Sequence, residues 1–580
     1  MRPSLTRIAG VFLSLLPALI LPSAKGTDLL PNVLFIAMDD LNDWIGCMGG
    51  HEQSLTPNLD RLAASGTLFT NAHCAAPACN PSRTAIFTGL APNTSGLYEN
   101  GQKMREILPD AVLMPQHFRN HGFRASGSGK MLHYFIDAQS WDEYYPKAES
   151  ENPFPRTLYP DSRPVNLPRG GPWQYVETDW AALDATDEEF GGDYLVAEWV
   201  SQELRKQHDQ SFFLACGIYR PHEPWFVPAR YFEPFPLEKI QLPPGYKEDD
   251  LDDLPPSGKR RGPNRYFAHI REHGQWKQAI QGYLASIHFA DAMLGRVLNA
   301  LENGPNRDRT IVVLWSDHGW HLGEKEHWQK FTLWRAASRV PLMLHVPADL
   351  CLTLPEGTQP GSICDRPVNL IDLFPTLTEL TSVPAKEDND GVSLVPLLKD
   401  PDAKWDRVST TYLGEPGSYS LSADDWRYIH YANGDEELYH ITQDPYEWDN
   451  LASNPEQGPK LTQMRALAPT QFAEKKEASL DAMPALRWLT AGDRAIPHSK
   501  PDGNIFDVIF INERENPVEL YWRSPAGGNK PYGLIEPGKN LRQQTRPGAV
   551  WFVAPPGQPE KPVGYFKVGD RKARATVPAK

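Results

Sequence analysis

The sequence lacks an excess of basic residues, and this limits its partners. It holds 58 Lys and Arg against 73 Asp and Glu, a formal net charge of −15 over 580 residues. No basic stripe offsets that charge, so the composition disfavours nucleic acid as a partner. It does not exclude a small anionic substrate, because a few buried cations can dominate a pocket locally.

Long apolar runs are also scarce, and the one candidate lies at the N-terminus. Arg2 and Arg7 precede the apolar run Ile8–Leu21, and small residues follow at Ala24 and Gly26. The run is short and interrupted by proline, which disfavours a membrane helix, and it is organised like a secretory signal; a retained anchor is the alternative. We therefore predict a signal peptide at residues 1–26, no later membrane span, and a secreted or periplasmic protein, or a lysosomal one if the source is eukaryotic. Without this segment the net charge is −18, because three basic residues and no acid are lost.

Cysteine is rare, with six residues, and no internal repeat is evident. Cys351 and Cys364 flank a loop rich in proline and glycine. They are the best candidates for a disulfide, but spacing alone leaves the connectivity open.

Most of the chain alternates strand and helix patterns. The continuous apolar runs Asn32–Met38 and Thr310–Trp315 are typical of strands covered on both faces. Apolar residues recur in steps of three and four from Ile280 to Leu301, which predicts a long amphipathic helix ended by Asn303-Gly304. A chain of this length should hold more than one domain. The alternation predicts an α/β domain with a mostly parallel central sheet over residues 27–400.

The remaining residues predict two smaller units. Short strands at 427–431 and 437–440 indicate a smaller α+β subdomain over residues 401–491. A polar, proline-containing stretch at 492–503 indicates a linker. Residues 504–580 predict an appended all-β sandwich, since short strand patterns alternate with turn signals such as Asn516-Pro517 and Pro537-Gly538.

Two of the predicted strands end in possible metal ligands. The first runs into Asp39 and Asp40, and the second into Asp317 and His318. Ligands of open α/β sheets bind outside the carboxyl ends of the strands, and carboxylates gathered there repel one another unless a cation lies between them. Oxygen ligands suit a hard divalent ion such as Ca²⁺ or Mg²⁺. The alternative is that Asp39-Asp40 only caps a helix or a turn.

A third element begins at Cys79. The segment Cys79-Asn80-Pro81-Ser82-Arg83 leads into a predicted helix, Pro81–Thr88, whose N-terminus points at residue 79 and favours an anion there. Further groups that could hold or protonate an anion lie in separate segments: Lys130, His133, His222 and Lys330. Each has a plain alternative, because single lysines are usually solvated and single histidines usually structural.

Together these motifs resemble the type I sulfatases of the alkaline phosphatase superfamily, most closely the iduronate-2-sulfatase-like branch. The matching segments lie at 32–40, 56–60, 79–89, 129–133, 219–224, 316–330, 437–439 and 444–451. The resemblance covers about residues 28–490 and implies an alkaline-phosphatase-like fold. It also implies that a formylglycine-generating maturase oxidises Cys79 to formylglycine. One hydroxyl of the hydrated aldehyde would attack sulfur, and proton loss from the other would expel sulfate and restore the aldehyde.

The resemblance assigns a metal site and a role to Arg83. Arg83 would hold the geometry of the diol. Many sulfatases have Asn where His318 stands, and histidine at this position is shared with the iduronate-type branch. The implied cofactor is Ca²⁺, a Lewis acid and template, bound by Asp39, Asp40, Asp317, His318 and the formylglycine oxygen at position 79.

Catalytic roles are implied for five further side chains. Lys130 and Lys330 would neutralise the sulfate oxygens. Asp317 would be the base for the attacking hydroxyl, and His222 would protonate the leaving alcohol. His133 would assist breakdown of the sulfated diol.

The C-terminal region carries a separate resemblance, to the β domain of the von Hippel–Lindau protein, through residues 518–522, 531–532, 537–538 and 550–552. The positions that correspond to its hydroxyproline pocket are Trp522, Tyr532, Thr545 and Trp551. Ala549 replaces the histidine expected there, which speaks against hydroxyproline binding. We therefore interpret these aromatic residues as the core of a structural sandwich, with a binding face as the alternative.

These observations predict an exported, Ca²⁺-dependent sulfuric ester hydrolase. The iduronate-type resemblance implies a sulfated sugar or polysaccharide, such as a sulfated uronic acid, as substrate. One alternative is a phosphomonoesterase or phosphonate monoester hydrolase of the same superfamily. The other is a catalytically silent binding protein that acts through its β domain, although every expected catalytic position is occupied. Nothing in the sequence indicates an oligomeric state.

Overall fold

The computed structural model describes residues 29–147, 152–169, 177–476, 480, 483–492, 495–501, 506–569 and 572–579. The expected signal peptide lies outside these residues. Within them, no helix is long and apolar enough to cross a membrane. All six cysteines are free thiols, so the candidate disulfide between Cys351 and Cys364 is not formed. Sγ of Cys364 instead faces the carbonyl oxygen of Pro401 at 3.5 Å.

The large domain is built on an eight-stranded sheet with the order β13-β2-β12-β9-β1-β7-β4-β5. Strand β1 pairs in parallel with β7 and β9, and β4 pairs in parallel with β7 and β5. Only β12 runs antiparallel to its neighbours β9 and β2. The mostly parallel sheet is confirmed. Its strands are β1 Asn32–Asp39, β2 Thr67–Phe69, β4 Arg124–Gly129, β5 Glu143–Tyr145, β7 Phe212–Pro221, β9 Thr310–Ser316, β12 Leu342–His345 and β13 Ser362–Cys364.

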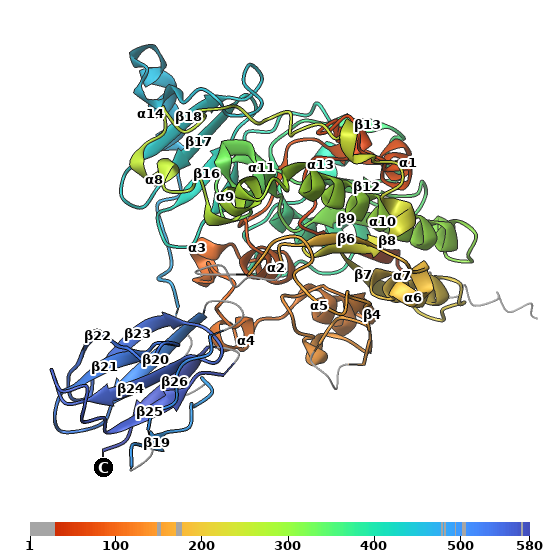
Figure 1. Ribbon diagram of the computed structural model, residues 1–580. Coiled ribbons are helices and arrows are strands. Elements are labelled where there is room, and N and C mark those ends of the chain that lie inside the picture. The colour runs from red at the N-terminus through yellow and green to blue at the C-terminus, as the bar shows by residue number, and fades with distance from the viewer. Residues whose placement is uncertain are drawn as a thin grey trace, which may run out of the picture.

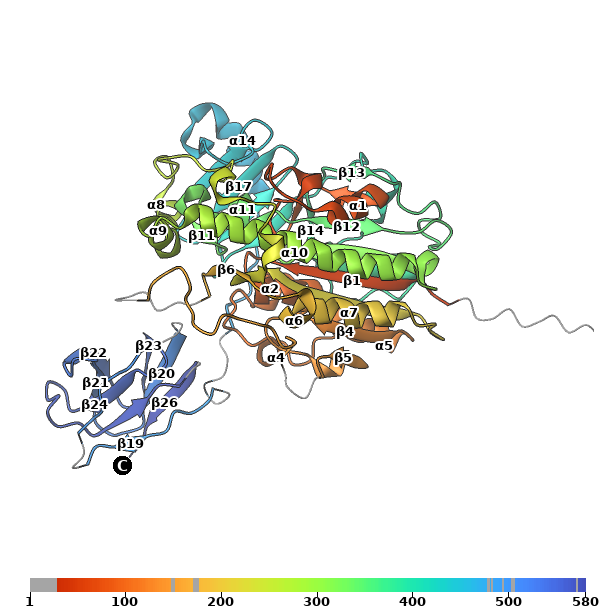
Figure 2. The same ribbon diagram turned by 45° about the vertical axis from the view of Figure 1, so that its right-hand side comes forward.

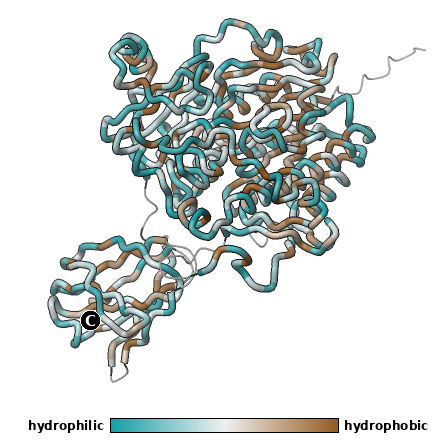
Figure 3. The backbone as a smooth tube through the Cα atoms, turned by 45° about the horizontal axis from the view of Figure 1, so that its top comes forward, coloured by the Kyte–Doolittle hydropathy of each residue, from teal (hydrophilic) through white to brown (hydrophobic). Residues whose placement is uncertain are grey.

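Helices cover both faces of this sheet, and alternate side chains of β1 point to opposite faces. Leu34 and Ile36 pack in a core with α7, Asp193–Leu204, and α10, Trp276–Glu302. Val33 and Phe35 pack in a second core on the other face, whose helices are α2 Cys79–Thr88, α5 Met114–Asn120 and α12 Leu373–Thr381. Figure 2 shows α10 running along β1, and Figure 3 shows hydrophobic segments gathered inside the domain.

A smaller unit follows, with an antiparallel sheet in the order β15-β16-β17-β18 (Figure 1). Helix α14, Gly458–Ala466, shares a hydrophobic core with this sheet. The predicted strands at 427–431 and 437–440 correspond to β17 and β18. The bounds are β15 Ser409–Tyr412, β16 Tyr419–Ser422, β17 Trp426–His430 and β18 Glu436–His440.

The C-terminal unit is a sandwich of two sheets, β19-β25-β24-β21-β22 and β23-β20-β26. Trp551 is 2 % exposed, and its indole donates to the hydroxyl of Thr545 at 2.8 Å. Trp522 and Tyr532 pack against the same core. This burial agrees with a structural role for the aromatic residues. The strands are β19 Leu489–Thr490, β20 Phe506–Asn512, β21 Val518–Arg523, β22 Asn529–Ile535, β23 Asn540–Thr545, β24 Val550–Ala554, β25 Gly564–Lys567 and β26 Ala573–Val577.

The stretch expected to be a linker lies partly on the sandwich. Strand β19 pairs with β25 before that stretch begins. Within the stretch, the buried hydroxyl of Ser499 accepts from the backbone N–H of Val550 at 2.8 Å. The polar, proline-containing sequence suggested exposure, but its backbone bonds to strands that follow later in the chain. The sandwich therefore begins before residue 504.

Candidate active site

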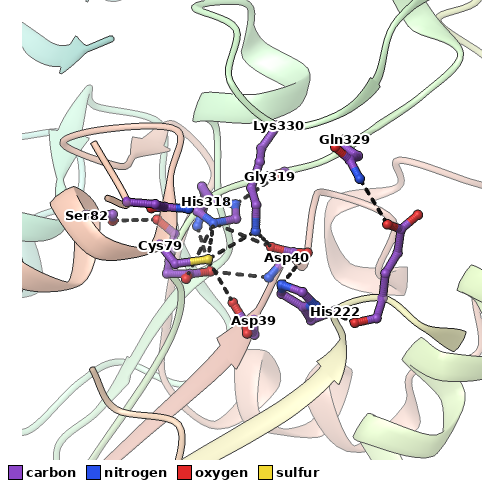
Figure 4. Close-up of polar contacts among 12 residues, drawn as sticks. Asp39, Asp40, Cys79, Ser82, His222, His318, Gly319, Gln329 and Lys330 are labelled. Atoms are coloured by element: carbon purple, nitrogen blue, oxygen red, sulfur yellow. Dashed lines mark hydrogen bonds and ion pairs between the residues drawn. The ribbon is translucent and has the colours of Figure 1, made fainter. Parts of the chain in front are cut away.

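The predicted site residues converge at the carboxyl ends of β1 and β9, around the first residue of α2. Cys79 is fully buried. Its Sγ lies 3.0 Å from Nζ of Lys330, 3.3 Å from Nε2 of His318 and 3.5 Å from Nζ of Lys130. Figure 4 shows Cys79 between Asp39, His318 and Lys330. Two ammonium groups and several possible metal ligands therefore surround the sulfur atom of Cys79.

A group of four side chains can hold a cation. Asp39, Asp40, Cys79 and His318 each offer a ligand atom, and these atoms lie within 4.8 Å of one another. Oδ2 of Asp40 is buried and has no hydrogen-bond partner among the described residues, which is the state of a carboxylate oxygen suited to a metal. Asp40 has a φ of 62°, a strained conformation that is common at functional sites. These residues fit a divalent metal ion.

Asp317 stands beside this group of four. Its Oδ2 accepts from Nε of Arg83 at 2.7 Å, and its Oδ1 accepts from the backbone N–H of Asp40 at 3.2 Å. Nε2 of His318 lies 3.5 Å from Oδ2 of Asp317. The carboxylate therefore ties the end of β9 to the end of β1 and to α2.

The charges of the site favour an anion at position 79. Burial alone would raise the pKa of the Cys79 thiol, but Lys130 and Lys330 hold it well below its usual value. Burial and Asp317 would raise the pKa of Asp39, but Lys130 is foremost among the cations that hold it below its usual range. Burial raises the pKa of Asp40. The site thus stabilises negative charge on residue 79 more strongly than on Asp40.

Arg83 fixes the position of Lys130. It is fully buried, and its Nη1 donates to the carbonyl oxygen of Lys130 at 2.6 Å. Lys130 follows Gly129, whose φ is 77°. A Cβ at Gly129 would lie 2.0 Å from the carbonyl oxygen of Gly217, so only glycine fits where β4 meets β7. This close packing lets Lys130 turn back toward Cys79 and form an ion pair with Asp39.

The two predicted histidines differ in their surroundings. Nδ1 of His222 lies 2.5 Å from the carbonyl oxygen of Glu223, which leaves Nε2 facing Oδ2 of Asp40 at 3.7 Å. Burial would lower the pKa of His222, but Asp40 holds it above its usual value. Burial lowers the pKa of His133, opposed in part by a hydrogen bond with Cys79. His222 is therefore the histidine better suited to hold a proton near neutral pH.

Sequence reasoning missed the role of Glu223. Its buried carboxylate accepts from Nε1 of Trp328 at 2.9 Å, from Nε2 of Gln329 at 3.1 Å and from the hydroxyl of Thr178 at 2.9 Å. Burial raises the pKa of Glu223 to about 7. Gln329 precedes Lys330, so Glu223 braces both His222 and the loop that carries the lysine. Figure 4 shows where His222, Gln329 and Lys330 lie in the site. The only signal in the sequence was an acid next to His222.

Two family descriptions match the chain: Sulfatase over residues 31–383, and N-sulphoglucosamine sulphohydrolase, C-terminal, over residues 323–471. A protein named Sulfatase from Formosa agariphila is 39% identical over 464 residues, which cover 78% of this chain and 88% of that protein. Iduronate 2-sulfatase from Homo sapiens is 30% identical over 397 residues, 62% of this chain and 70% of that protein. The solved phosphonate monoester hydrolase of Agrobacterium radiobacter shares the fold, with a TM-score of 0.59 and 21% identity over 77% of this chain and 100% of that one. Because the Sulfatase match spans more than half of the residues and contains the whole charged cluster, the chain belongs to the type I sulfatases of the alkaline phosphatase superfamily.

Proposed function

We propose that this sulfuric ester hydrolase releases sulfate from a sulfated carbohydrate, using Ca²⁺ and a formylglycine formed from Cys79. The observation that carries the proposal is the convergence of two ammonium groups and several metal-ligating side chains on residue 79. A thiol alone cannot complete the hydrolytic cycle, so an aldehyde at this position supplies the nucleophile after hydration.

Ca²⁺ is the proposed cofactor because the site offers mainly carboxylate oxygens, which suit a hard cation. Asp39, Asp40, Asp317, His318 and residue 79 would hold it. When bound there, Ca²⁺ supplies Lewis acidity and orients the reacting groups. The unpartnered Oδ2 of Asp40 supports this assignment.

Lys130 and Lys330 are proposed to neutralise the sulfate oxygens. Both are buried, and Asp39 and Asp40 respectively are the chief groups that raise their pKa values against the effect of burial. They therefore stay charged at neutral pH. Fixed cations in a water-poor site stabilise the developing charge of a group transfer without reorganising.

Proton transfers are proposed for three side chains. His222 would protonate the leaving alcohol, because Asp40 raises its pKa and Glu223 orients its ring. Burial would raise the pKa of Asp317, but Arg83, His318 and Lys130 together hold it below its usual value, and this carboxylate would accept the proton of the attacking hydroxyl. His133, with a pKa below its usual value, would act as the base in regenerating residue 79.

The substrate class and the setting are also proposals. Relatives named iduronate 2-sulfatase and ulvan-active sulfatase support a sulfated sugar or polysaccharide. Export through residues 1–26 and maturation by a formylglycine-generating enzyme complete the proposal. We propose an α/β domain over residues 27–400, a smaller subdomain that begins at residue 401 and ends before residue 489, and a C-terminal sandwich that includes residues 489–490 and Ser499 because of their contacts with it.

The test is mass spectrometry of the peptide that contains residue 79 after co-expression with a formylglycine-generating enzyme, together with sulfate release from sulfated sugars. We expect an aldehyde at 79 and turnover that Cys79→Ala abolishes, while the matched variant Cys47→Ala keeps it. Fully active protein with unmodified thiol at 79 would overturn the proposal. Higher kcat/KM for phosphate or phosphonate esters than for matched sulfates would favour the alternative of the same superfamily.

A further inference from the structure

A cavity of about 360 Å³ adjoins the cluster around Cys79. Tyr134 and Tyr219 line the cavity and also lie beside Lys130. The rings of Tyr134 and Tyr219 lie 4.8 and 5.4 Å from Nζ of Lys130. The ring of Tyr219 also stacks on His222 at 4.7 Å. The cavity therefore begins one aromatic ring away from the groups proposed to bind sulfate and protonate the leaving alcohol. Its volume falls in the range of small-molecule sites.

Arg220 lines this cavity and is 1 % exposed. Its guanidinium lies over the rings of Tyr219 and Phe190, at 5.2 and 5.7 Å. It donates one hydrogen bond, from Nη2 to the carbonyl oxygen of Phe226 at 3.3 Å, and its buried Nε has no partner within the described part of the chain. A buried cation without a paired anion is strongly destabilising unless another group compensates its charge.

Other fully buried arginines are paired. Arg83 forms an ion pair with Asp317 at 2.7 Å, and Arg427 forms one with Glu447 at 2.9 Å. Across the residues described, no ion pair of this kind involves Arg220. Arg220 thus lines the cavity as a buried cation without such an ion pair, and its Nε is left without a hydrogen-bond partner in the described chain.

The acids near the cavity do not replace such a partner. The carboxylate of Asp193 accepts from the backbone N–H groups of Tyr219 and Arg220, at 2.7 and 3.0 Å. Burial raises the pKa of Asp193, and the nearby charge of Arg220 is the first of the effects that oppose this shift. Glu177 also lines the cavity and has a partner of its own. Beside these acids, Arg220 lines the cavity with a guanidinium whose Nε has no hydrogen-bond partner in the described chain.

Tyr134 supplies a surface for a sugar ring beside this cation. It is 42% exposed, and its φ of 58° is a strained conformation that persists only where surrounding contacts enforce it. Contacts with the rings of His133 and Phe154 hold it at the cavity wall. Aromatic side chains with one exposed face suit the apolar face of a pyranose.

On the basis of the function proposed above, we propose that Arg220 binds a second anionic group of the substrate, either a carboxylate or a second sulfate. In this arrangement the sugar ring lies against Tyr134. A guanidinium fork binds either group through two parallel hydrogen bonds, which a lysine cannot reproduce. Arg220 is thus a specificity-determining residue that selects doubly charged sugars.

The test compares Arg220→Met and Arg220→Lys with the wild type on four substrates: an aryl sulfate, a neutral monosulfated pyranose, a sulfated uronate and a disulfated pyranose. We expect Arg220→Met to lose about ten-fold or more in kcat/KM on a doubly charged sugar, chiefly through KM, and distinctly less on the aryl sulfate. Arg220→Lys should recover part of the loss. The matched control Arg156→Met changes an exposed arginine of the neighbouring loop and should behave as wild type.

The outcomes separate the possibilities. A loss confined to the uronate identifies a carboxylate as the occupant, and one confined to the disulfated sugar identifies a sulfate. Equal losses on all four substrates, or none, would overturn the inference. If Arg220→Met does not fold, a second measurement decides the question. It compares how strongly an unsulfated uronate and inorganic sulfate inhibit aryl sulfate hydrolysis by the wild type and by Arg220→Lys. Equal inhibition of both proteins refutes the inference. A wild type that cleaves no sulfate refutes the proposed function, whereas one that cleaves the aryl sulfate without discrimination by Arg220 refutes this inference alone.

Discussion

Nζ of Lys330 lies 2.7 Å from Oδ1 of Asp40, although 290 residues separate the two in the chain. The neighbours of Lys330 are strained: Gln329 and Phe331 have φ values of 80° and 70°. Strain of this kind persists only where surrounding contacts enforce it. Here the amide of Gln329 is bound by Glu223, and the N–H of Phe331 by the carbonyl of Pro77 at 3.1 Å. The loop is thus held in the conformation that brings Lys330 to the site.

Replacing the lysine should impair sulfate transfer itself. We expect Lys330→Met to lower kcat/KM by about 10²–10³ on aryl and sugar sulfates alike, because the ammonium contacts the group common to both. Steady-state kinetics on both classes check this, and far-UV circular dichroism checks the fold. Lys539→Met, on the exposed surface of the sandwich, is the control. A loss limited to one leaving-group class would contradict the assigned role.

Removing the metal should remove activity reversibly. Chelation should abolish turnover, and added Ca²⁺ should restore it and raise the melting temperature, because a cation that binds only the folded protein stabilises it. Asp40→Asn should weaken both effects, since it removes the charge of the carboxylate whose Oδ2 has no hydrogen-bond partner. Full activity in protein stripped of metal would refute the cation site.

His222 should matter most for poor leaving groups. If it is the general acid, His222→Ala should slow sugar sulfates far more than aryl sulfates, which need little protonation at the transition state. The measurement is kcat/KM against leaving-group pKa, and the slope should become steeper in the variant. Lys330→Met provides the comparison, with an unchanged slope. An unchanged slope for His222→Ala would argue against its role.

The sequence carried enough information to find the catalytic cluster. Asp39 and Asp317 end strands that lie side by side in a parallel sheet, so their meeting follows from the strand pattern once the sheet is parallel. Family resemblance supplied Lys130, Lys330 and His222, whose convergence depends on loops with no periodic pattern. The structure places Lys130 and Lys330 beside the sulfur of Cys79, and His222 beside Asp40.

What could not be predicted depends on long-range packing. The carboxylate of Glu223 is bound by side chains 45 and more than 100 residues away, and no local pattern encodes such a contact. In the sequence, Arg220 was recognisable only as a neighbour of His222. Its burial without an ion-pair partner in the described chain depends on its contacts with the ring of Phe190 and the carbonyl oxygen of Phe226. Sequence patterns predict strands of the sandwich at 508–511, 518–522, 550–553 and 565–568. They do not reveal β22, β23 and β26, which carry many exposed polar residues or, for β26, a single short alternation.

Glu223 should make stability depend on pH. Burial raises its pKa from 4.5 to about 7, so the folded protein binds a proton more tightly than the unfolded chain. Ionising Glu223 therefore destabilises the fold as pH rises from about 4.5 to 7, by at most about 3 kcal/mol. Glu223→Gln cannot ionise, so its melting temperature relative to wild type should climb across this window and level off above it. Glu515→Gln, at an exposed position, should give a flat difference, and a flat difference for Glu223→Gln too would mean that its carboxylate is not destabilised.

The sandwich should be dispensable for the chemistry, provided the chain is cut at the right place. Residues up to Lys476 belong with the α/β domain, since Gln102 donates to the carbonyl of Lys476 at 2.7 Å. The N–H of Leu486 donates to the carbonyl of Arg574 at 2.7 Å, so the chain has joined the sandwich by then. A protein ending at Lys476 should keep turnover on a small sulfate ester, whereas one ending at Asp493 keeps strand β19 without its partner and should be less soluble.

A contact between the sandwich and the large domain bears on whether the shortened protein keeps small-ester turnover. A Cβ on Gly101 would lie 2.2 Å from Nζ of Lys572, so the sandwich touches the loop between helix α3, Pro92–Ser95, and helix α4, Met104–Ile107. Figures 1 and 2 both show the sandwich close to α4. If this contact helps to shape the site, the shortened protein will fold, bind metal and carry the aldehyde, yet lose small-ester turnover, and Lys572→Ala in the full chain will reproduce the loss. If the contact only docks the sandwich, Lys572→Ala will leave small-ester kinetics unchanged, and the shortened protein will match it.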